Sequence, residues 1–483
     1  MQRNGNIFTS IDLVTIAMYL AMVFFGWINV YGAIYNYEMT SMFSFSNMAG
    51  KQFVWIMTSF VVALVILVVD HKLFDMSAYL IYFAWIVVLI ATAKFATPVK
   101  GSLSWLKLGP ISLQPAEFSK FITALALAKW MGQYEFKIKD WRDLAVPLAI
   151  ILAPMFIIMV LEKETGSALV YAAFFLVLYR EGMSGYVLWT GLAVFVLFVI
   201  VIKYGNITLP LGTGNVGVLV SSLVIIAIAA VLLIRLAQLK RETLIMLGAV
   251  AFIYAVALIV NIWHKVNFNI VAIVAAVTSG IYAAIMNSQH RNKGLWLVAV
   301  FVVGAVIFCQ LSATMFAKLP PHQRKRIEVT LKIKDDPTGV EYNVIQAKIA
   351  IGSGGLTGKG YKQGTQTKLR FVPEQHTDFI FSTIGEEFGF LGTLAVVVTY
   401  MFFILRLIFL AERQKDMFSQ IFGYSVACIF LMHFTINIGM VLGILPVIGI
   451  PLPFFSYGGS STLGFTILLF IFLKLDAARV EKL

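Results

Sequence analysis

Long apolar stretches separated by short polar ones run along almost the whole chain. A helix needs about 20 predominantly apolar residues to cross the hydrocarbon core of a bilayer, and the sequence offers such stretches repeatedly. It does not show the alternating segments of about ten residues that a membrane β-barrel requires. The pattern therefore predicts an all-α polytopic membrane protein built as a helical bundle.

We place about fourteen membrane spans on this pattern. They cover roughly 11–33, 53–70, 78–96, 117–133, 144–161, 166–180, 184–203, 215–237, 243–263, 267–287, 295–317, 379–405, 417–443 and 454–474. Two of them are unusual, because 117–133 carries three charged residues and 166–180 is short for a core of about 30 Å. The first stretch is too long for the apolar region of a cleavable signal peptide, so we expect it to be the first anchor.

Composition agrees with a membrane protein, since 60% of the residues are hydrophobic and only 13% are charged. The net charge of +13 comes from Lys and Arg scattered between the spans, which does not indicate a nucleic-acid partner. With a cytoplasmic N-terminus, nearly every loop on the cytoplasmic side is basic. We therefore expect a multi-pass protein of the cytoplasmic (inner) membrane, with both termini in the cytoplasm.

Three segments interrupt the succession of spans, and the helix count places all three on the outer face. The largest is a loop of some sixty residues, 317–378, and long loops of this kind are often functional. Residues 100–120 combine Gly, Pro and Trp in an interfacial or re-entrant pattern. Residues 437–461 hold three prolines between two spans, which predicts a broken turn. We treat residues 1–483 as one integral membrane domain.

Acidic residues at membrane depth or at its edge are candidates for function because they are costly there. Asp378 lies at the junction of the large loop and a long span, where partial burial would favour a general base. A helix N-terminal acid stabilised by the helix dipole is an equally good interpretation. Glu386 and Glu387 follow on the same helix, and we expect them to form hydrogen bonds within the bundle.

Glu117 and Lys120 lie three residues apart, on one face of a helix, so they could form an ion pair. That pair could simply neutralise itself in lipid. Alternatively, Lys120 could offer a cation to an anionic ligand while Glu117 orients it.

The large loop is basic, with Arg326, Lys348 and Lys359 among its cations, and such a loop would attract a pyrophosphate. A glycine-rich run at 352–360 lacks the order of a P-loop, so we do not expect nucleotide binding. Nothing in the chain has the spacing of metal ligands. A divalent cation held loosely on pyrophosphate, Mg²⁺ or Mn²⁺, stays open as a cofactor.

Four stretches, in order, resemble the SEDS family of peptidoglycan glycosyltransferases, the RodA/FtsW type. They are GSLSWLKLGPISLQPAEFSK (101–120), KETGSAL (163–169), the stretch from YNVIQAKIAIGSGG to HTDFIFSTIGEEFGFLG (342–392) and GILPVIGIPLPFFSYGGSS (443–461). The GTQ at 364–366 looks closer to the RodA elongation branch than to the FtsW division branch.

The resemblance implies an inverting enzyme that polymerises lipid II at the outer face of the cytoplasmic membrane, for elongation and cell shape, beside a class B penicillin-binding protein. Asp378, in the HTDF motif, would be its catalytic base, and Lys120 would offset charge on the departing undecaprenyl pyrophosphate. The matched motifs imply further substrate-binding residues, namely Glu117, Trp105, Glu164, Lys348, Lys359, Gln366, Glu374, His376 and Ser456. Arg326, a cation of the basic loop outside these motifs, is a further candidate.

The chain departs from the family pattern in three places. Glu164 stands where an Asp is usual, Ser104 stands where Arg is frequent, and about four helices in 204–294 are additional to a usual core of about ten. We expect these inserted helices to be peripheral packing or a partner surface.

Two other classes of function compete with an enzyme. A lipid II flippase would also need acids within the membrane, although the sequence shows no obvious inverted repeat and its polar residues gather on one face. A scaffold that only recruits the penicillin-binding protein would tolerate replacement of Asp378.

Overall fold

The computed structural model describes residues 10–35, 42–45, 47–99, 101–109, 111–133, 138, 141–210, 213–237, 239–290, 293–319, 321–336 and 339–479. The chain divides into two compact units. Unit 1 is Met1–Ser184 with Pro337–Leu483, and unit 2 is Gly185–Asp336.

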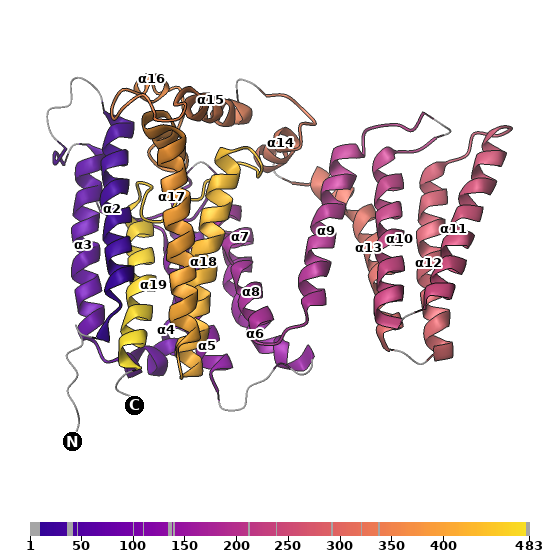
Figure 1. Cartoon of the computed structure of the whole chain (residues 1–483), viewed down its shortest axis with the longest axis horizontal. Helices are drawn as coiled ribbons and strands as arrows, with labels where there is room; N and C mark the ends of the chain where they lie inside the picture. Colours follow the sequence, from indigo (N-terminus) through magenta and orange to yellow (C-terminus); the bar gives the residue numbers. More distant parts are fainter. Residues whose placement is uncertain are drawn as a thin grey trace. The chain divides into compact units, whose positions relative to one another are not determined.

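Unit 1 contains residues 100–120 and 437–461 and the part of the large loop from Pro337 onward, and it is a bundle of helices (Figure 1). It also holds one small two-stranded hairpin. Its elements are α2 (Leu13–Ile34), α3 (Met48–Val68), α4 (His71–Phe95), β1 (Leu106–Leu108), β2 (Ile111–Leu113), α5 (Pro115–Met131), α6 (Trp141–Phe156), the π-helical η1 (Ile157–Leu161), α7 (Thr165–Val170), α8 (Ala173–Arg180), α15 (Val340–Ser353), α16 (Thr365–Lys368), α17 (Ile380–Glu412), α18 (Met417–Val441) and α19 (Gly459–Ala478).

Unit 2 is helical throughout its described residues. Its helices are α9 (Gly185–Tyr204), α10 (Val216–Ala237), α11 (Lys240–Asn261), α12 (Phe268–His290), α13 (Lys293–Ala317) and α14 (Pro321–Thr330). Small residues such as Ala275, Ala276 and Ala283 on α12 are buried, which lets neighbouring helices approach closely. Three of these helices, α10 to α12, lie wholly within 204–294, so a set of four inserted helices would have to include α9 or α13.

The predicted spans are confirmed as helices. In the described part of the chain, twelve helices are long and apolar enough to cross a membrane. The remaining two predictions correspond to α5 and to the pair α7 and α8. Helix α5 tolerates charge because protein surrounds it: it packs against α4, α6, α18 and α19, and both Glu117 and Lys120 are buried.

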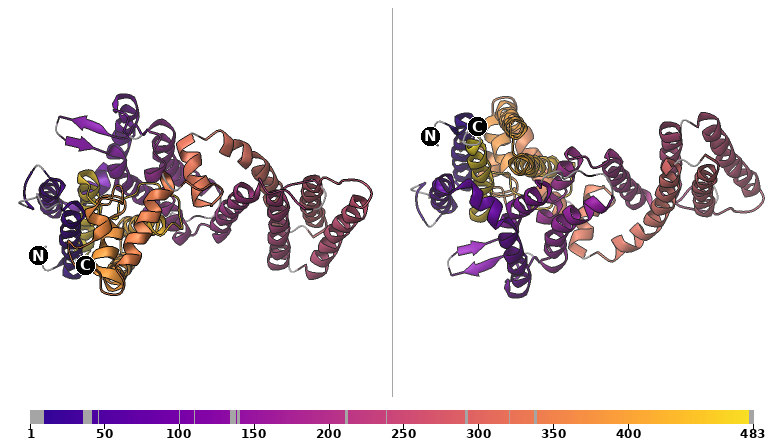
Figure 2. Two further views of the ribbon diagram at one scale, coloured as in Figure 1. Left: turned by 90° about the horizontal axis from the view of Figure 1, so that it is seen from above. Right: turned by 90° about the horizontal axis from the view of Figure 1, so that it is seen from below.

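Local chemistry explains the irregular parts that hydropathy did not predict. Strands β1 and β2 pair as an antiparallel hairpin, which stands out from the bundle in Figure 2. Pro154 near the end of α6 has no N–H to donate, and the chain continues in the wider π-helical η1. The span predicted at 166–180 is interrupted by a turn at Tyr171 and Ala172.

The described part of the large loop contains three helices, α14, α15 and α16, and α15 and α16 lie across one end of the unit 1 bundle (Figure 1). Below them α17 is broken at Gly389, where φ is 66°. The peptide groups freed by the break pair with the loop: Phe390 N donates to Gly355 O and Gly360 N donates to Glu387 O, at 2.8 and 3.0 Å.

Glycines in the loop make this pairing possible. A Cβ at Gly354 would collide with Gly385 O, and a Cβ at Gly358, where φ is +82°, would collide with Glu387 O. The glycine-rich run at 352–360 therefore serves the close approach of two backbones.

Candidate active site

Asp378 lies in the turn that leads into α17, and its side chain is half-buried. The carbonyls of three successive residues in this turn are each held by a donor from α18 or from the proline-rich loop between α18 and α19. The bonds run from Asn437 Nδ2 to Asp378 O at 2.9 Å, from Ser456 Oγ to Thr377 O at 2.6 Å and from Tyr457 N to His376 O at 2.8 Å. The backbone at the candidate base is therefore fixed by α18 and by the loop that follows it.

The carboxylate of Asp378 faces the proline-rich loop at Gly449. A Cβ built on Gly449 would lie 3.2 Å from Asp378 Oδ2, and φ at this glycine is +81°. Both the left-handed backbone and the close approach favour glycine at this position. Hence the proline-rich loop, residues 443–458, forms one wall beside the candidate base.

Glu374 and His376 lie in the same turn as Asp378. Glu374 has φ of 55° and its carboxylate accepts a hydrogen bond from Thr377 Oγ1 at 3.2 Å. The ring of His376 lies 5.9 Å from that of Tyr457. These predicted residues are thus brought together with Asp378 and Ser456.

Glu164 lies on the other side of the proline-rich loop, at the start of α7. Its Oε1 accepts from Gln114 Nε2 and from Ser167 Oγ, both at 2.6 Å. A Cβ on Gly166 would come within 3.2 Å of Ile448 O, so the start of α7 packs directly on this loop. The predicted residues Asp378 and Glu164 therefore flank the same short stretch of backbone.

Glu162 is one of the acidic residues that the sequence places at the edge of a membrane span, and it is completely buried next to Glu164. Neither carboxylate oxygen has a hydrogen-bond partner among the described residues. Burial, and secondarily the charge of Glu164, raises the pKa of Glu162 to about 8. Its backbone carbonyl accepts from Leu103 N at 2.8 Å, which ties the segment before β1 to the end of η1.

Lys120 forms the predicted ion pair with Glu117, at 2.8 Å between Nζ and Oε1, and its side chain is only 2% exposed. The ammonium also lies 2.9 Å from Nε2 of His433 on α18 and 5.3 Å from the centre of the Phe465 ring. Lys120 is thus enclosed by protein partners in this conformation. The sequence analysis did not include His433, which is 313 positions away along the chain.

Lys359 and Gln366 are used to hold the large loop onto α17. Lys359 Nζ pairs with Glu386 Oε1 at 2.8 Å, and the backbone N–H of Gln366 donates to the same oxygen at 2.8 Å. Thr367 donates to the other oxygen from its backbone N–H and its hydroxyl. Glu386 therefore forms the expected hydrogen bonds, but it makes them to the loop above the helix.

The remaining predicted residues lie on other elements of the structure. Trp105 is half-buried just before β1, and Lys348 is an exposed residue of α15. The Lys348 ammonium approaches the end of α18, 2.7 Å from the position of a Cβ on Gly443. Arg326 belongs to α14, in unit 2.

Among the described residues, no three His, Cys, Asp or Glu side chains are grouped so that they could hold a metal ion, so we assign no step to a metal.

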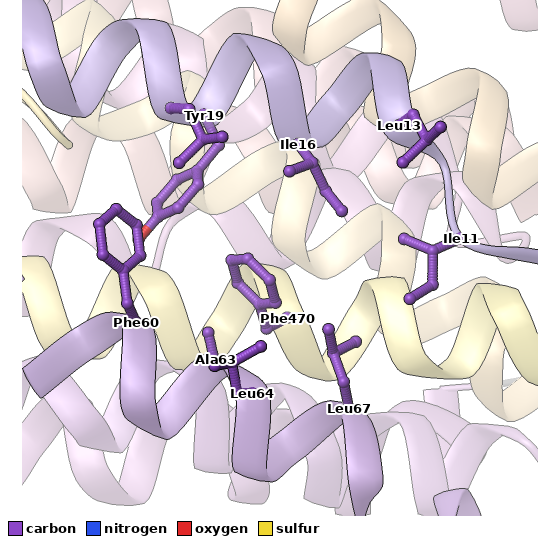
Figure 3. A pocket seen from close by; sticks show the side chains of 10 residues that line it. Ile11, Leu13, Ile16, Tyr19, Phe60, Ala63, Leu64, Leu67 and Phe470 are labelled. Atoms are coloured by element: carbon purple, nitrogen blue, oxygen red, sulfur yellow. The ribbon is translucent and has the colours of Figure 1, made fainter. Parts of the chain in front are cut away.

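A cavity of about 320 Å³ lies between α2, α3 and α19, where Tyr19, Phe60 and Phe470 face one another (Figure 3). Its lining is almost wholly apolar, and none of the predicted site residues in the described chain contributes to it.

Comparison with known proteins places this arrangement in a family. The model of the FtsW/RodA/SpoVE family of cell cycle proteins matches residues 12–209 and 219–481. A protein of Treponema pallidum (strain Nichols) named peptidoglycan glycosyltransferase RodA is 30% identical over 417 residues, 85% of each chain. Peptidoglycan glycosyltransferase MrdB of Escherichia coli K12 is 44% identical over 164 residues, 34% of this chain and 43% of that one.

The fold is also found among solved structures. A chain from a peptidoglycan synthase complex, described for its structural coordination of polymerization and crosslinking, aligns with a TM-score of 0.61 at 20% identity, over 97% of this chain and 98% of that one. Since the family model spans nearly the whole chain and the motifs at 101–120, 163–169, 376–379 and 443–461 converge in one place, this multi-pass membrane protein belongs to the FtsW/RodA/SpoVE family.

Proposed function

We propose that this protein is a peptidoglycan glycosyltransferase that polymerises lipid II into glycan strands at the outer face of the cytoplasmic membrane, for cell elongation and shape. Its membership of a family whose similar members are named peptidoglycan glycosyltransferase RodA and MrdB carries this proposal. The fixed turn at Asp378 supports it, because a base must be held in a constant position relative to the hydroxyl that it deprotonates.

In the proposed reaction, the 4-hydroxyl of the acceptor GlcNAc attacks the anomeric carbon of the donor MurNAc. Asp378 takes the hydroxyl proton as the new C–O bond forms. The bond from the anomeric carbon to undecaprenyl pyrophosphate breaks, and the configuration at that carbon is inverted. The lipid pyrophosphate is already an activated leaving group, so no nucleotide is needed.

Cations around the site would offset the negative charge that develops on the leaving pyrophosphate. Lys348 of α15 suits a direct contact with the pyrophosphate, because it is exposed and its ammonium lies beside Gly443, where the proline-rich loop begins. Lys120 is enclosed between Glu117 and His433. We therefore propose that Lys120 acts from beneath this loop as a buried positive charge.

We also propose a class B penicillin-binding protein as the partner. The structural neighbour from a complex that coordinates polymerization and crosslinking supports this, since crosslinking requires a transpeptidase. The distribution of Lys and Arg supports cytoplasmic termini, with the loop that carries α15 and α16 on the outer face.

The test is polymerisation of purified lipid II by the purified protein with its cognate penicillin-binding protein, comparing the native chain with Asp378→Asn. We expect glycan from the native protein and a loss of at least about 100-fold in the variant, in the range typical of general-base removal. Asp416→Asn is the matched control, because Asp416 caps α18 at its opposite end and Asn caps helices equally well.

Each failure has a distinct meaning. Equal activity of the native protein and Asp378→Asn would show that Asp378 is not the base. An inactive native protein, under conditions where a control polymerase works, would favour a lipid II flippase or a scaffold.

A further inference from the structure

Two buried residues on one face of α18, His433 and Asn437, contact Lys120 and the turn at Asp378, respectively. They are four residues apart, so their side chains lie one above the other on the helix. His433 is 1% exposed and Asn437 is not exposed at all. Most buried polar side chains are hydrogen-bonded, so the partners of these two are informative. Among the described residues, both bonds of Asn437 are made by Nδ2, and its Oδ1 has no partner.

Both residues hold the backbone of the proline-rich loop. Prolines 446, 451 and 453 remove donors from this loop, so its buried carbonyls depend on side chains from neighbouring helices. Asn437 Nδ2 donates to Ile450 O at 2.7 Å, and His433 Nδ1 lies 3.4 Å from Pro451 O. Tyr400 of α17 donates to Pro453 O. Three carbonyls of the loop, those of residues 450, 451 and 453, thereby contact side chains of α17 and α18.

Each of the two residues also contacts a residue that we propose takes part in the reaction. Asn437 Nδ2 also donates to Asp378 O at 2.9 Å, and His433 Nε2 lies 2.9 Å from Lys120 Nζ. A lysine ammonium only donates, so Nε2 of His433 accepts and the ring proton lies on Nδ1, toward Pro451 O. The imidazole is therefore neutral and bridges Lys120 to the loop.

Gly449 lies next to these anchored carbonyls and against the carboxylate of Asp378. We propose that His433 and Asn437 are positioning residues that set the distance between the proline-rich loop and Asp378, and that His433 fixes this loop with respect to the buried charge of Lys120. The proposal rests on the proposed glycosyltransferase function for its kinetic consequence. Its structural consequence can be measured without activity.

Variants of His433 separate positioning from packing. Glutamine can accept from Lys120 and donate to Pro451 O, whereas leucine of similar size can do neither. We expect His433→Leu to lower kcat for lipid II polymerisation about 10-fold to 100-fold, with KM changed less than about twofold, because small misplacements at a reacting centre have effects of this size. His433→Gln is expected to restore kcat to within about threefold of native.

The matched control is Ser425→Ala. Ser425 is a fully buried residue of α18 whose hydroxyl bonds only within the helix in the described contacts, to Ile421 O at 2.8 Å. Its loss removes a buried hydrogen bond without touching the site. We expect both variants to stay folded in thermal melting, with His433→Leu the less stable because Lys120 and Pro451 O lose a buried partner. Only His433→Leu should lose turnover.

Hydrogen–deuterium exchange tests the same idea independently of activity. In His433→Leu and in Asn437→Leu, amides of 444–458 and 376–379 should exchange faster than in the native protein, and in Ser425→Ala they should not. Unchanged exchange in both segments would overturn the proposal whatever the activity. So would a native-like kcat in His433→Leu, or a His433→Gln variant as slow as His433→Leu. A native protein without activity but with the expected exchange would overturn the proposed function alone.

Discussion

At the scale of single residues, the turn at Asp378 is held through its carbonyls. Donors from Asn437, Ser456 and Tyr457 bind the three carbonyls of residues 376–378. These bonds do not depend on the charge of the carboxylate. Asp378→Asn keeps all three backbone bonds and the size of the side chain, so we expect it to destabilise the protein by no more than about 1 kcal/mol, a few degrees in melting temperature.

Glu162 gives a prediction about pH. Its pKa is raised to about 8 by burial and by Glu164, from 4.5 for an ordinary Glu. Between these values the unfolded chain ionises this carboxyl while the folded chain keeps it protonated, so the free energy of unfolding falls as pH rises through this window. Each unit of pKa difference is worth about 1.4 kcal/mol, so the effect of the side chain is on the order of several kcal/mol.

Glu162→Gln should remove this dependence, because the amide is neutral at every pH. We expect thermal melting at pH 8 to be higher in the variant than in the native protein, and the two to converge near pH 5. Glu412→Gln, at a half-exposed carboxylate of α17, is the control and should follow the native curve. Parallel curves for Glu162→Gln and the native chain would show that Glu162 is ionised in the fold.

Sequence reasoning found the members of the site that local spacing reveals and missed those that only tertiary contact reveals. Glu117 and Lys120 are three residues apart, so their pairing follows from helical geometry. His433 and Asn437 lie in an apolar span with no neighbouring polar pattern, and their partners are distant in sequence. The roles of Asp378, Trp105 and the basic loop residues stay predictions.

At the scale of elements, the contact between the large loop and α17 depends on glycine. Gly358 has φ of +82°, and a Cβ there would collide with Glu387 O. We expect Gly358→Ala to destabilise the protein by about 1–3 kcal/mol or more, the usual cost of strained backbone. Thermal melting measures it.

Gly352→Ala is the matched control in the same run. A Cβ on Gly352 would have nothing within 4 Å, so this change should be worth less than about 0.5 kcal/mol. If both variants melt alike, the pairing of the loop with the broken turn of α17 does not contribute to stability.

Hydropathy predicted the long helices well because about 20 apolar residues are a strong signal. Helix α5 was also predicted, although its burial inside unit 1 explains its charges better than lipid does. The hairpin of β1 and β2 escaped prediction because strands of three residues carry too little alternation to be seen. The turn within 166–180 likewise has no proline or glycine at its centre to mark it.

At the scale of the whole molecule, the proposed orientation can be tested with single cysteines. Gln363 in the large loop and Lys415 between α17 and α18 are both exposed. In a chain with Cys309→Ala and Cys428→Ala, we expect Gln363→Cys to react with a membrane-impermeant maleimide in cells whose outer barrier is opened. Lys415→Cys should react only after the cytoplasmic membrane is permeabilised. The reverse result would invert the topology.

The division into two units also belongs to this scale. All the clustered site residues lie in unit 1, whereas Arg326 and the proposed inserted helices of 204–294 lie in unit 2. Hydropathy cannot separate these units, because both consist of apolar helices of similar length. That the helices of 204–294 are peripheral to catalysis stays a proposal.

The break in α17 also affects how the chain enters a bilayer. Peptide groups released at Gly389 would cost several kcal/mol each in hydrocarbon if they had no partner. Their partners lie upstream, at Gly355, Leu356 and Gly360, and ribosomes deliver those residues first. The hydrogen-bond partners of the freed peptide groups are therefore synthesised before the break itself. We expect these groups to be satisfied within the chain as α17 enters the bilayer, with no need for a lipid headgroup, a water molecule or a second protein.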